Sequence, residues 1–161
     1  MSPSPDGRRL AYLAGAMERA PDRGRAWRAR LGPVFETLGH ACFNPCVEEA
    51  TLLSDEERAG FRDWKAAGDA RFVPLMRRII GFDLAALARA DYVVCLWDEY
   101  AQWSGGTPAE VSFAYQWGLP VYLVLAMPRV EVSSWVQGCA SRTFDDLGEL
   151  ERFLLAEYGG A

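Results

Sequence analysis

The sequence has only one histidine, His40, among its 161 residues. A hydrolase that depends on a Ser-His-Asp triad is therefore nearly excluded, because that chemistry needs a histidine base. Zinc binding is not indicated either, because the cysteines lack the paired spacing of metal ligands. These four are Cys42, Cys46, Cys95 and Cys139. We expect no cofactor, because no Ser/Thr-rich loop that would hold a flavin phosphate follows the first apolar segment.

Basic residues are fewer than acidic ones, 17 against 22, and the net charge is -5. A protein that binds a nucleic acid polymer would normally carry a basic face, so that function is not expected. The one cluster of arginines is most simply a solvated helix face. It contains Arg19, Arg23, Arg25, Arg28 and Arg30.

Long hydrophobic runs are also absent. The two longest, residues 92–97 and 121–127, fall far below the ~20 residues that span a bilayer. Residues 1–7 are rich in proline and serine and lack the apolar centre of a signal peptide. We therefore expect a cytoplasmic protein with reduced thiols and no membrane partner.

The composition is otherwise that of a globular protein, 50% hydrophobic and 12% aromatic. This predicts one domain over residues 9–161, preceded by a flexible tail over residues 1–8. Strand-like and helix-like segments alternate along the domain. Strands are predicted at 10–14, 40–43, 91–97, 120–126 and 141–144, and helices at 22–38, 71–90, 107–118 and 145–158. The polar, acidic segment 47–69 is predicted to be a mobile excursion with a short helix, lying over a ligand crevice.

This alternation indicates right-handed parallel crossovers. We therefore predict an α/β fold, a flavodoxin-like three-layer sandwich whose parallel sheet has about five strands. Ligands bind at the carboxyl ends of such strands. The apolar strand 91–97 ends directly before Asp98, and Glu110 follows the glycine loop at Gly105 and Gly106. Two acids are thus expected to flank the crevice.

Several short motifs occur in an order that resembles the nucleoside 2-deoxyribosyltransferase family over residues 10–153. They are Tyr12-Leu13-Ala14-Gly15, Asn44-Pro45, Asp83 before Ala90-Asp91, and Gly106-Thr107-Pro108-Ala109-Glu110-Val111 before a Pro-Val strand. The resemblance implies that Glu110 attacks the anomeric carbon of a nucleoside and that Tyr12 holds this glutamate in place. It also implies that Asp83 and Asp98 assist protonation and release of the base.

The residues themselves fit this chemistry. Cleavage of an N-glycosidic bond develops oxocarbenium character, so it needs an anion near the sugar and a proton donor for the base. Glu110 is predicted near the third position of a helix, where the helix dipole favours an ionised carboxylate and hence a nucleophile. Gly105 and Gly106 leave room for a sugar to approach the backbone.

Each of these residues has a structural alternative. Residues 107–110 also match a capping box with proline at the first helical position. Tyr12 can be an ordinary core aromatic, Asp83 a solvated helix residue, and Asp98 a turn former at the end of its strand. Glu99, adjacent to Asp98, could occupy the functional place instead.

The sequence also departs from the family pattern. Transferases of the family often use an asparagine shortly before a Ser-Trp pair, supplied by a neighbouring subunit, and Glu131 stands there before Ser134. A related branch hydrolyses nucleoside 5′-monophosphates and holds the phosphate with serines, one of which Ser133 could match. However, Ala16 and Met17 replace the serine-containing loop of that branch. Because Glu131 would repel a phosphate, we expect nucleosides to be preferred. The predicted substrate-binding set is Gly15, Asn44, Gly105, Gly106, Glu131, Ser133 and Ser134.

The many aromatic residues exceed what one core of this size readily buries. Aromatics are enriched at interfaces, so a homodimer or larger homo-oligomer with a shared active site is expected. The predicted function is cleavage of a nucleoside N-glycosidic bond, with transfer of the (deoxy)ribosyl group to another base or to water. The alternatives are a nucleoside 5′-monophosphate N-glycosidase and a non-catalytic nucleotide-binding sensor on the same fold.

Overall fold

The structure is a computed structural model that describes residues 7–160. Its centre is a five-stranded sheet in the order β2-β1-β3-β4-β5 with every pair parallel. The strands are β1 (Leu10–Gly15), β2 (Ala41–Phe43), β3 (Tyr92–Trp97), β4 (Val121–Leu125) and β5 (Arg142–Phe144). The predicted α/β class and flavodoxin-like strand order are confirmed. Of the predicted tail, only Gly7 and Arg8 fall within the described residues.

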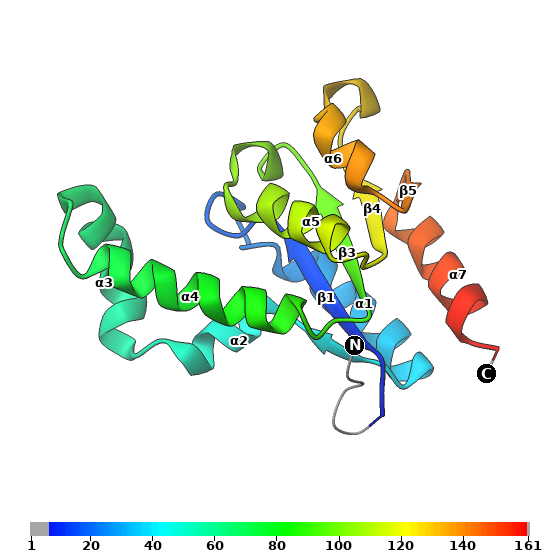
Figure 1. Ribbon diagram of the computed structural model, residues 1–161, viewed down its shortest axis with the longest axis horizontal. Coiled ribbons are helices and arrows are strands. Elements are labelled where there is room, and N and C mark those ends of the chain that lie inside the picture. The colour runs from blue at the N-terminus through cyan, green and yellow to red at the C-terminus, as the bar shows by residue number, and fades with distance from the viewer. Residues whose placement is uncertain (1–6, 161) are drawn as a thin grey trace.

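Helices cover both faces of the sheet, which gives three layers (Figure 1). One face packs against α1 (Arg25–Leu38) and α7 (Leu147–Tyr158). The other packs against α4 (Phe72–Leu87), α5 (Gly106–Gln116) and α6 (Ser134–Cys139). All residues of β3 and β4 are buried. This explains why both strands are continuous apolar runs without alternation.

The segment after β2 differs from the sequence prediction. It forms two helices, α2 (Pro45–Leu52) and α3 (Asp55–Ala67), instead of a mobile excursion with one short helix. Ser54 and Glu57 form a complete capping box at the start of α3, and the small apolar cluster around Leu53, Leu75 and Ile79 joins this segment to α4. Figure 1 shows α2, α3 and the first turns of α4 extending to one side of the sheet.

The end of the chain also contains elements that the sequence did not indicate. Between β4 and β5, where no helix was predicted, the chain forms the short 3-10 helix η2 (Arg129–Glu131) and then α6. A second short 3-10 helix, η1 (Ala101–Trp103), lies between β3 and α5. Across residues 7–160, no helix has both the length and the apolar character that crossing a bilayer requires.

Candidate active site

The carboxyl ends of β1 and β3 lie next to each other in the middle of the sheet. β1 pairs with β2 on one side and β3 on the other, so the strand order reverses between β1 and β3. In open parallel sheets, a crevice for ligands lies outside the carboxyl ends at such a switch point. Gly15 ends β1 and pairs with Leu96, immediately before Trp97 and Asp98. Tyr12 lies on β1, three residues before its carboxyl end.

Glu110 projects from α5 toward Tyr12 of β1. The Tyr12 hydroxyl donates a hydrogen bond to Oε1 of Glu110 over 2.8 Å, so the contact expected from the sequence is present. Tyr12 is 0% exposed, and its ring stacks on Phe43 with the centroids 5.3 Å apart. The buried ring therefore fixes the direction from which the hydroxyl meets the half-buried Glu110 carboxylate.

The structure contradicts both the capping-box alternative for residues 107–110 and the predicted position of Glu110 near the third residue of the helix. α5 begins at Gly106, so Glu110 is the fifth helical residue and Pro108 the third. Gly105 and Gly106 already have helical geometry, and Ser104 Oγ lies 3.4 Å from the Thr107 backbone nitrogen as its acceptor. Because the helix begins earlier than the pattern suggested, the Glu110 side chain does not cap it. Its carboxylate instead accepts the hydrogen bond from Tyr12 of β1.

Several groups act on the charge of Glu110. Burial raises the pKa of Glu110, whereas the Tyr12 hydrogen bond and the positive charge of Arg28 lower it, and the overall direction is upward. Tyr12 and Arg28, more than the start of α5, thus favour the ionised carboxylate. Burial and the charge of Glu110 raise the pKa of Tyr12 far above its usual range. Tyr12 consequently keeps its proton and acts as a donor.

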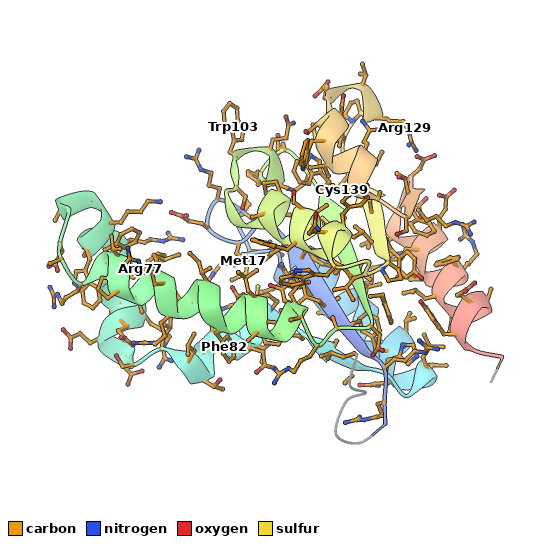
Figure 2. All side chains as sticks on the ribbon, in the orientation of Figure 1. Met17, Arg77, Phe82, Trp103, Arg129 and Cys139 are labelled. Atoms are coloured by element: carbon orange, nitrogen blue, oxygen red, sulfur yellow. The ribbon has the colours of Figure 1, made fainter. Side chains whose placement is uncertain are left out.

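Asp83 is a second carboxyl group at the site. It lies on α4 next to Phe82, which is labelled in Figure 2. Burial, together with the nearby charges of Glu110 and Glu49, raises the pKa of Asp83 to about 7. Its Oδ1 is buried and has no hydrogen-bond partner within residues 7–160. A carboxyl group in this state can hold a proton near neutral pH and give it to a ligand.

A third carboxylate, Glu49 of α2, was not anticipated. It raises the pKa of both Asp83 and Glu110, and it forms an ion pair of 2.8 Å with Arg23. Arg23 lies in the loop after β1 and has a positive φ of 59°, which is uncommon for a residue with a side chain. The sequence signal was weak, because Glu49 belongs to the acidic segment for which a mobile excursion with a short helix was predicted.

Arg28 is a second residue that the sequence reasoning missed. It was assigned to a solvated helix face, but only 2% of it is exposed. Its guanidinium donates to the carbonyl oxygens of Gly15 and Gly24 over 3.0 Å each. Arg28 is the fourth residue of α1 and points inward under the carboxyl end of β1. Arg28 lies on the same helix face as the buried residues Trp27, Leu31 and Phe35, which was a sequence signal for its burial. Its positive charge nevertheless led to the prediction that it is exposed.

Asp98 directly follows β3 and forms a turn. Its Oδ1 accepts hydrogen bonds from the backbone nitrogens of Tyr100 (3.0 Å) and Ala101 (2.8 Å). This geometry supports the turn-forming alternative, and a role with the leaving base stays a prediction. The neighbouring Glu99 is exposed. From η1, Trp103 points away from the sheet and is 74% exposed (Figure 2).

The predicted binding glycines and Asn44 have clear local roles. A Cβ at Gly15 would lie 3.0 Å from the Trp27 ring, so the close packing of α1 requires glycine there. A Cβ at Gly105 would meet nothing within 4 Å, which leaves space beside the backbone at the start of α5. Asn44 Oδ1 accepts a hydrogen bond from the Cys46 backbone nitrogen and caps α2.

Glu131, Ser133 and Ser134 lie at the end of η2 and the start of α6, and all three are exposed. Among the described residues, none of the three is hydrogen-bonded to Glu110 of the same chain. The next residue, Trp135, is hydrogen-bonded to Ser112 of α5 through its indole nitrogen over 2.9 Å. Their expected contribution to a neighbouring protomer's site stays a prediction. Within residues 7–160, no group of three or more His, Cys, Asp or Glu is arranged to hold a metal ion.

The fold is shared with several solved structures, two of which are named as enzymes. A 2-deoxyribosyltransferase from Bacillus psychrosaccharolyticus is 21% identical, with a TM-score of 0.64 over 92% of this chain and 95% of that one. A conserved protein from Enterococcus faecalis V583 is 14% identical, with a TM-score of 0.63 over 93% of this chain and 99% of that one.

A CMP N-glycosidase from Clostridium botulinum is 15% identical, with a TM-score of 0.52 over 91% of this chain and 98% of that one. No protein-family model matches the sequence, and no curated protein matches it. The likeness is one of fold, and it extends over nearly the whole chain. The fold implied by the sequence resemblance to deoxyribosyltransferases is therefore confirmed.

Proposed function

We propose that this protein is a nucleoside deoxyribosyltransferase-like enzyme that cleaves the N-glycosidic bond of a nucleoside with Glu110 as nucleophile. The observation that carries the proposal is the hydrogen bond between the Tyr12 hydroxyl and Oε1 of Glu110, beside the half-buried Asp83. The reaction needs an oriented carboxylate as the nucleophile and a protonated carboxyl group as the proton donor for the base. The shared fold with a deoxyribosyltransferase and a CMP N-glycosidase supports it.

In the first step, a carboxylate oxygen of Glu110 attacks C1′ of the sugar. The C1′–N bond breaks, its electron pair moves to the nitrogen of the base, and a glycosyl ester of Glu110 forms. Tyr12 holds the attacking carboxylate through the other oxygen, which limits its rotation during attack. The second oxygen, free of this hydrogen bond, is the one available to the sugar.

The leaving base needs a proton, and in this proposal Asp83 supplies it. With a pKa of about 7, Asp83 is protonated in a substantial fraction of molecules at neutral pH. In the second step, a nitrogen of an acceptor base or a water oxygen attacks C1′ and regenerates the Glu110 carboxylate. The Asp83 carboxylate receives the proton that this acceptor loses, so the cycle closes without a cofactor.

We propose further that the protein is a homodimer or larger homo-oligomer. Among residues 7–160, five large aromatic residues are exposed: Trp103, Phe113, Tyr115, Trp117 and Trp135. Phe113 and Tyr115 lie on α5, which carries Glu110, Trp117 directly follows α5, and Trp135 lies on α6, which follows Ser133. A second copy covering this surface would bring Glu131, Ser133 and Ser134 close to another Glu110 and complete the site for the sugar.

The test is incubation of the protein with a panel of nucleosides and 5′-monophosphates, with and without acceptor bases, and identification of products by mass. New nucleosides formed only with an acceptor base would establish transfer, and free base formed without one would establish hydrolysis. Cleavage restricted to 5′-monophosphates would assign the protein to the nucleotide N-glycosidases instead. Binding without any turnover would favour the sensor and overturn the proposal.

A further inference from the structure

We propose that Arg28 is a positioning residue for this reaction, which holds the loop after β1 in place beside the sugar and balances the charge of Glu110. The inference rests on the proposed function. Among the described residues, the guanidinium of Arg28 is hydrogen-bonded to backbone carbonyl oxygens and to Cys46, and not to Glu110. It acts through the backbone and through its charge.

The guanidinium ties together both ends of the loop between β1 and α1. It donates to the carbonyl oxygens of Leu13 (3.3 Å) and Gly15 (3.0 Å) on β1. It also donates to the carbonyl oxygens of Arg23 (3.3 Å) and Gly24 (3.0 Å) at the start of α1. Both chain segments that border the crevice on this side are therefore held by one side chain.

The loop geometry is adapted to this guanidinium. Gly24 has a φ of +70°, and a Cβ there would lie 2.3 Å from Nη1 of Arg28. Cys46 of α2 closes the arrangement, because its thiol donates to the Arg23 carbonyl oxygen over 2.9 Å and accepts from Arg28 over 3.5 Å. The position of Arg23, and with it the Arg23–Glu49 ion pair, thus depends on Arg28.

In the part of the chain that the structure describes, no carboxylate is hydrogen-bonded to Arg28. Each hydrogen bond that its guanidinium makes within residues 7–160 ends on a carbonyl oxygen or on the Cys46 sulfur. Arginine stays charged even when buried. This buried charge acts at longer range on three carboxylates of the described chain and favours the ionised form of each: Glu110, Glu49 and Asp22. Of these, Glu110 is hydrogen-bonded to Tyr12 of β1, and Arg28 is hydrogen-bonded to Leu13 and Gly15 of the same strand, so β1 holds both side chains near its carboxyl end.

This arrangement separates the two effects of Arg28. Lysine would retain the charge, but its single ammonium group cannot reach the carbonyl oxygens of both segments as a planar guanidinium does. Methionine would retain much of the volume and remove both the charge and the hydrogen bonds. Arg30 lies on the same helix, is exposed, and pairs with Glu151, which makes it a matched control.

The experiment measures kcat/KM against pH for the wild type and for Arg28→Met, Arg28→Lys and Arg30→Met. We expect Arg28→Met to move the acid limb upward by about one pH unit, because an opposite charge favours the ionised carboxylate by that order. We expect Arg28→Lys to keep the limb and lower kcat by about tenfold, because the sugar-side loop is misplaced. Arg30→Met should change neither.

A loss of activity in Arg28→Met without movement of the acid limb would overturn the charge-balancing role, and wild-type kcat in Arg28→Lys would overturn the positioning role. If Arg28→Met does not fold, the Arg28→Lys result decides alone. NMR titration of the Glu110 carboxyl carbon in the wild type and Arg28→Met gives a readout without turnover. Catalytic silence of the wild type would count against the proposed function, whereas an unchanged Glu110 titration would count against Arg28.

Discussion

The Tyr12 hydroxyl on β1 lies 2.8 Å from Oε1 of Glu110 on α5, although 98 positions separate the two residues in the sequence. The sheet brings β1 and the end of β3 together, and the glycine loop then returns the chain as α5 above Tyr12. Because the Tyr12 ring is fully buried, the hydrogen bond has one direction. This pair is the basis of the first prediction.

Replacing Tyr12 with phenylalanine should lower kcat by about 10²-fold with little change in KM, because a misplaced catalytic group costs that order of rate. The measurement is steady-state kinetics on the preferred substrate. Tyr122→Phe is the matched control, since it also removes a hydroxyl hydrogen bond, that to Tyr158, on the opposite face of the sheet. Equal losses in both variants would indicate a general effect on folding.

Asp83→Asn should slow substrates with poor leaving bases most, because those bases depend most on protonation. A set of nucleosides whose bases differ in basicity gives the slope of log kcat against leaving-group pKa, and this slope should steepen in the variant. Asp146→Asn is the comparison and should leave the slope unchanged, since Asp146 caps α7 on the opposite face of the sheet. A parallel loss across all substrates in Asp83→Asn would assign Asp83 another role.

The activity should depend on pH as a bell. Glu110 must be ionised to attack, so its raised pKa sets the acid limb, above the usual range of a glutamate. Asp83 must be protonated to serve the base, so activity should fall as the pH rises through about 7. The pH profile of kcat/KM checks this, and the alkaline limb should disappear in Asp83→Asn. An alkaline limb that persists there would belong to another group.

The same carboxyl group makes a prediction for stability. The pKa of Asp83 is raised in the folded state, so its protonated form favours folding, and this contribution is lost as the pH rises through about 7. Asp83→Asn should therefore raise the Tm at pH 8, by roughly 2–4 °C if it relieves 1 kcal/mol, and have little effect at pH 4. Thermal unfolding at both pH values measures this. A lower Tm at pH 8 would contradict it.

The sequence predicted the sheet better than it predicted the surroundings of the site. The strands β3 and β4 were predicted correctly because both of their faces are buried and every residue is apolar. The contact between Tyr12 and Glu110 was predicted from the family resemblance that the order of motifs carries, and the structure contains this contact. The start of α5 was predicted one residue late, because Gly106 is a poor helix former that the local turn nevertheless places in the helix.

Arg28 and Glu49 could not be predicted in the same way. Their charges indicate exposure, yet Arg28 is buried because backbone carbonyl oxygens at the end of β1 satisfy its donors. These acceptors come together only in the folded chain, so no local sequence pattern predicts that Arg28 is buried. Glu49 reaches the site because α2 and α3 form an ordered unit around Leu53, and the acidic composition of that segment concealed its apolar contacts.

The nucleophilic role of Glu110 is tested most directly by the mass of the intact protein after reaction with a 2′-fluorinated nucleoside, whose electron-withdrawing fluorine slows release of a glycosyl ester. We predict a mass increase equal to one fluorinated pentosyl group, located by peptide mapping on Glu110 and absent in Glu110→Gln. Turnover without any adduct on Glu110, or an adduct on another residue, would contradict the account.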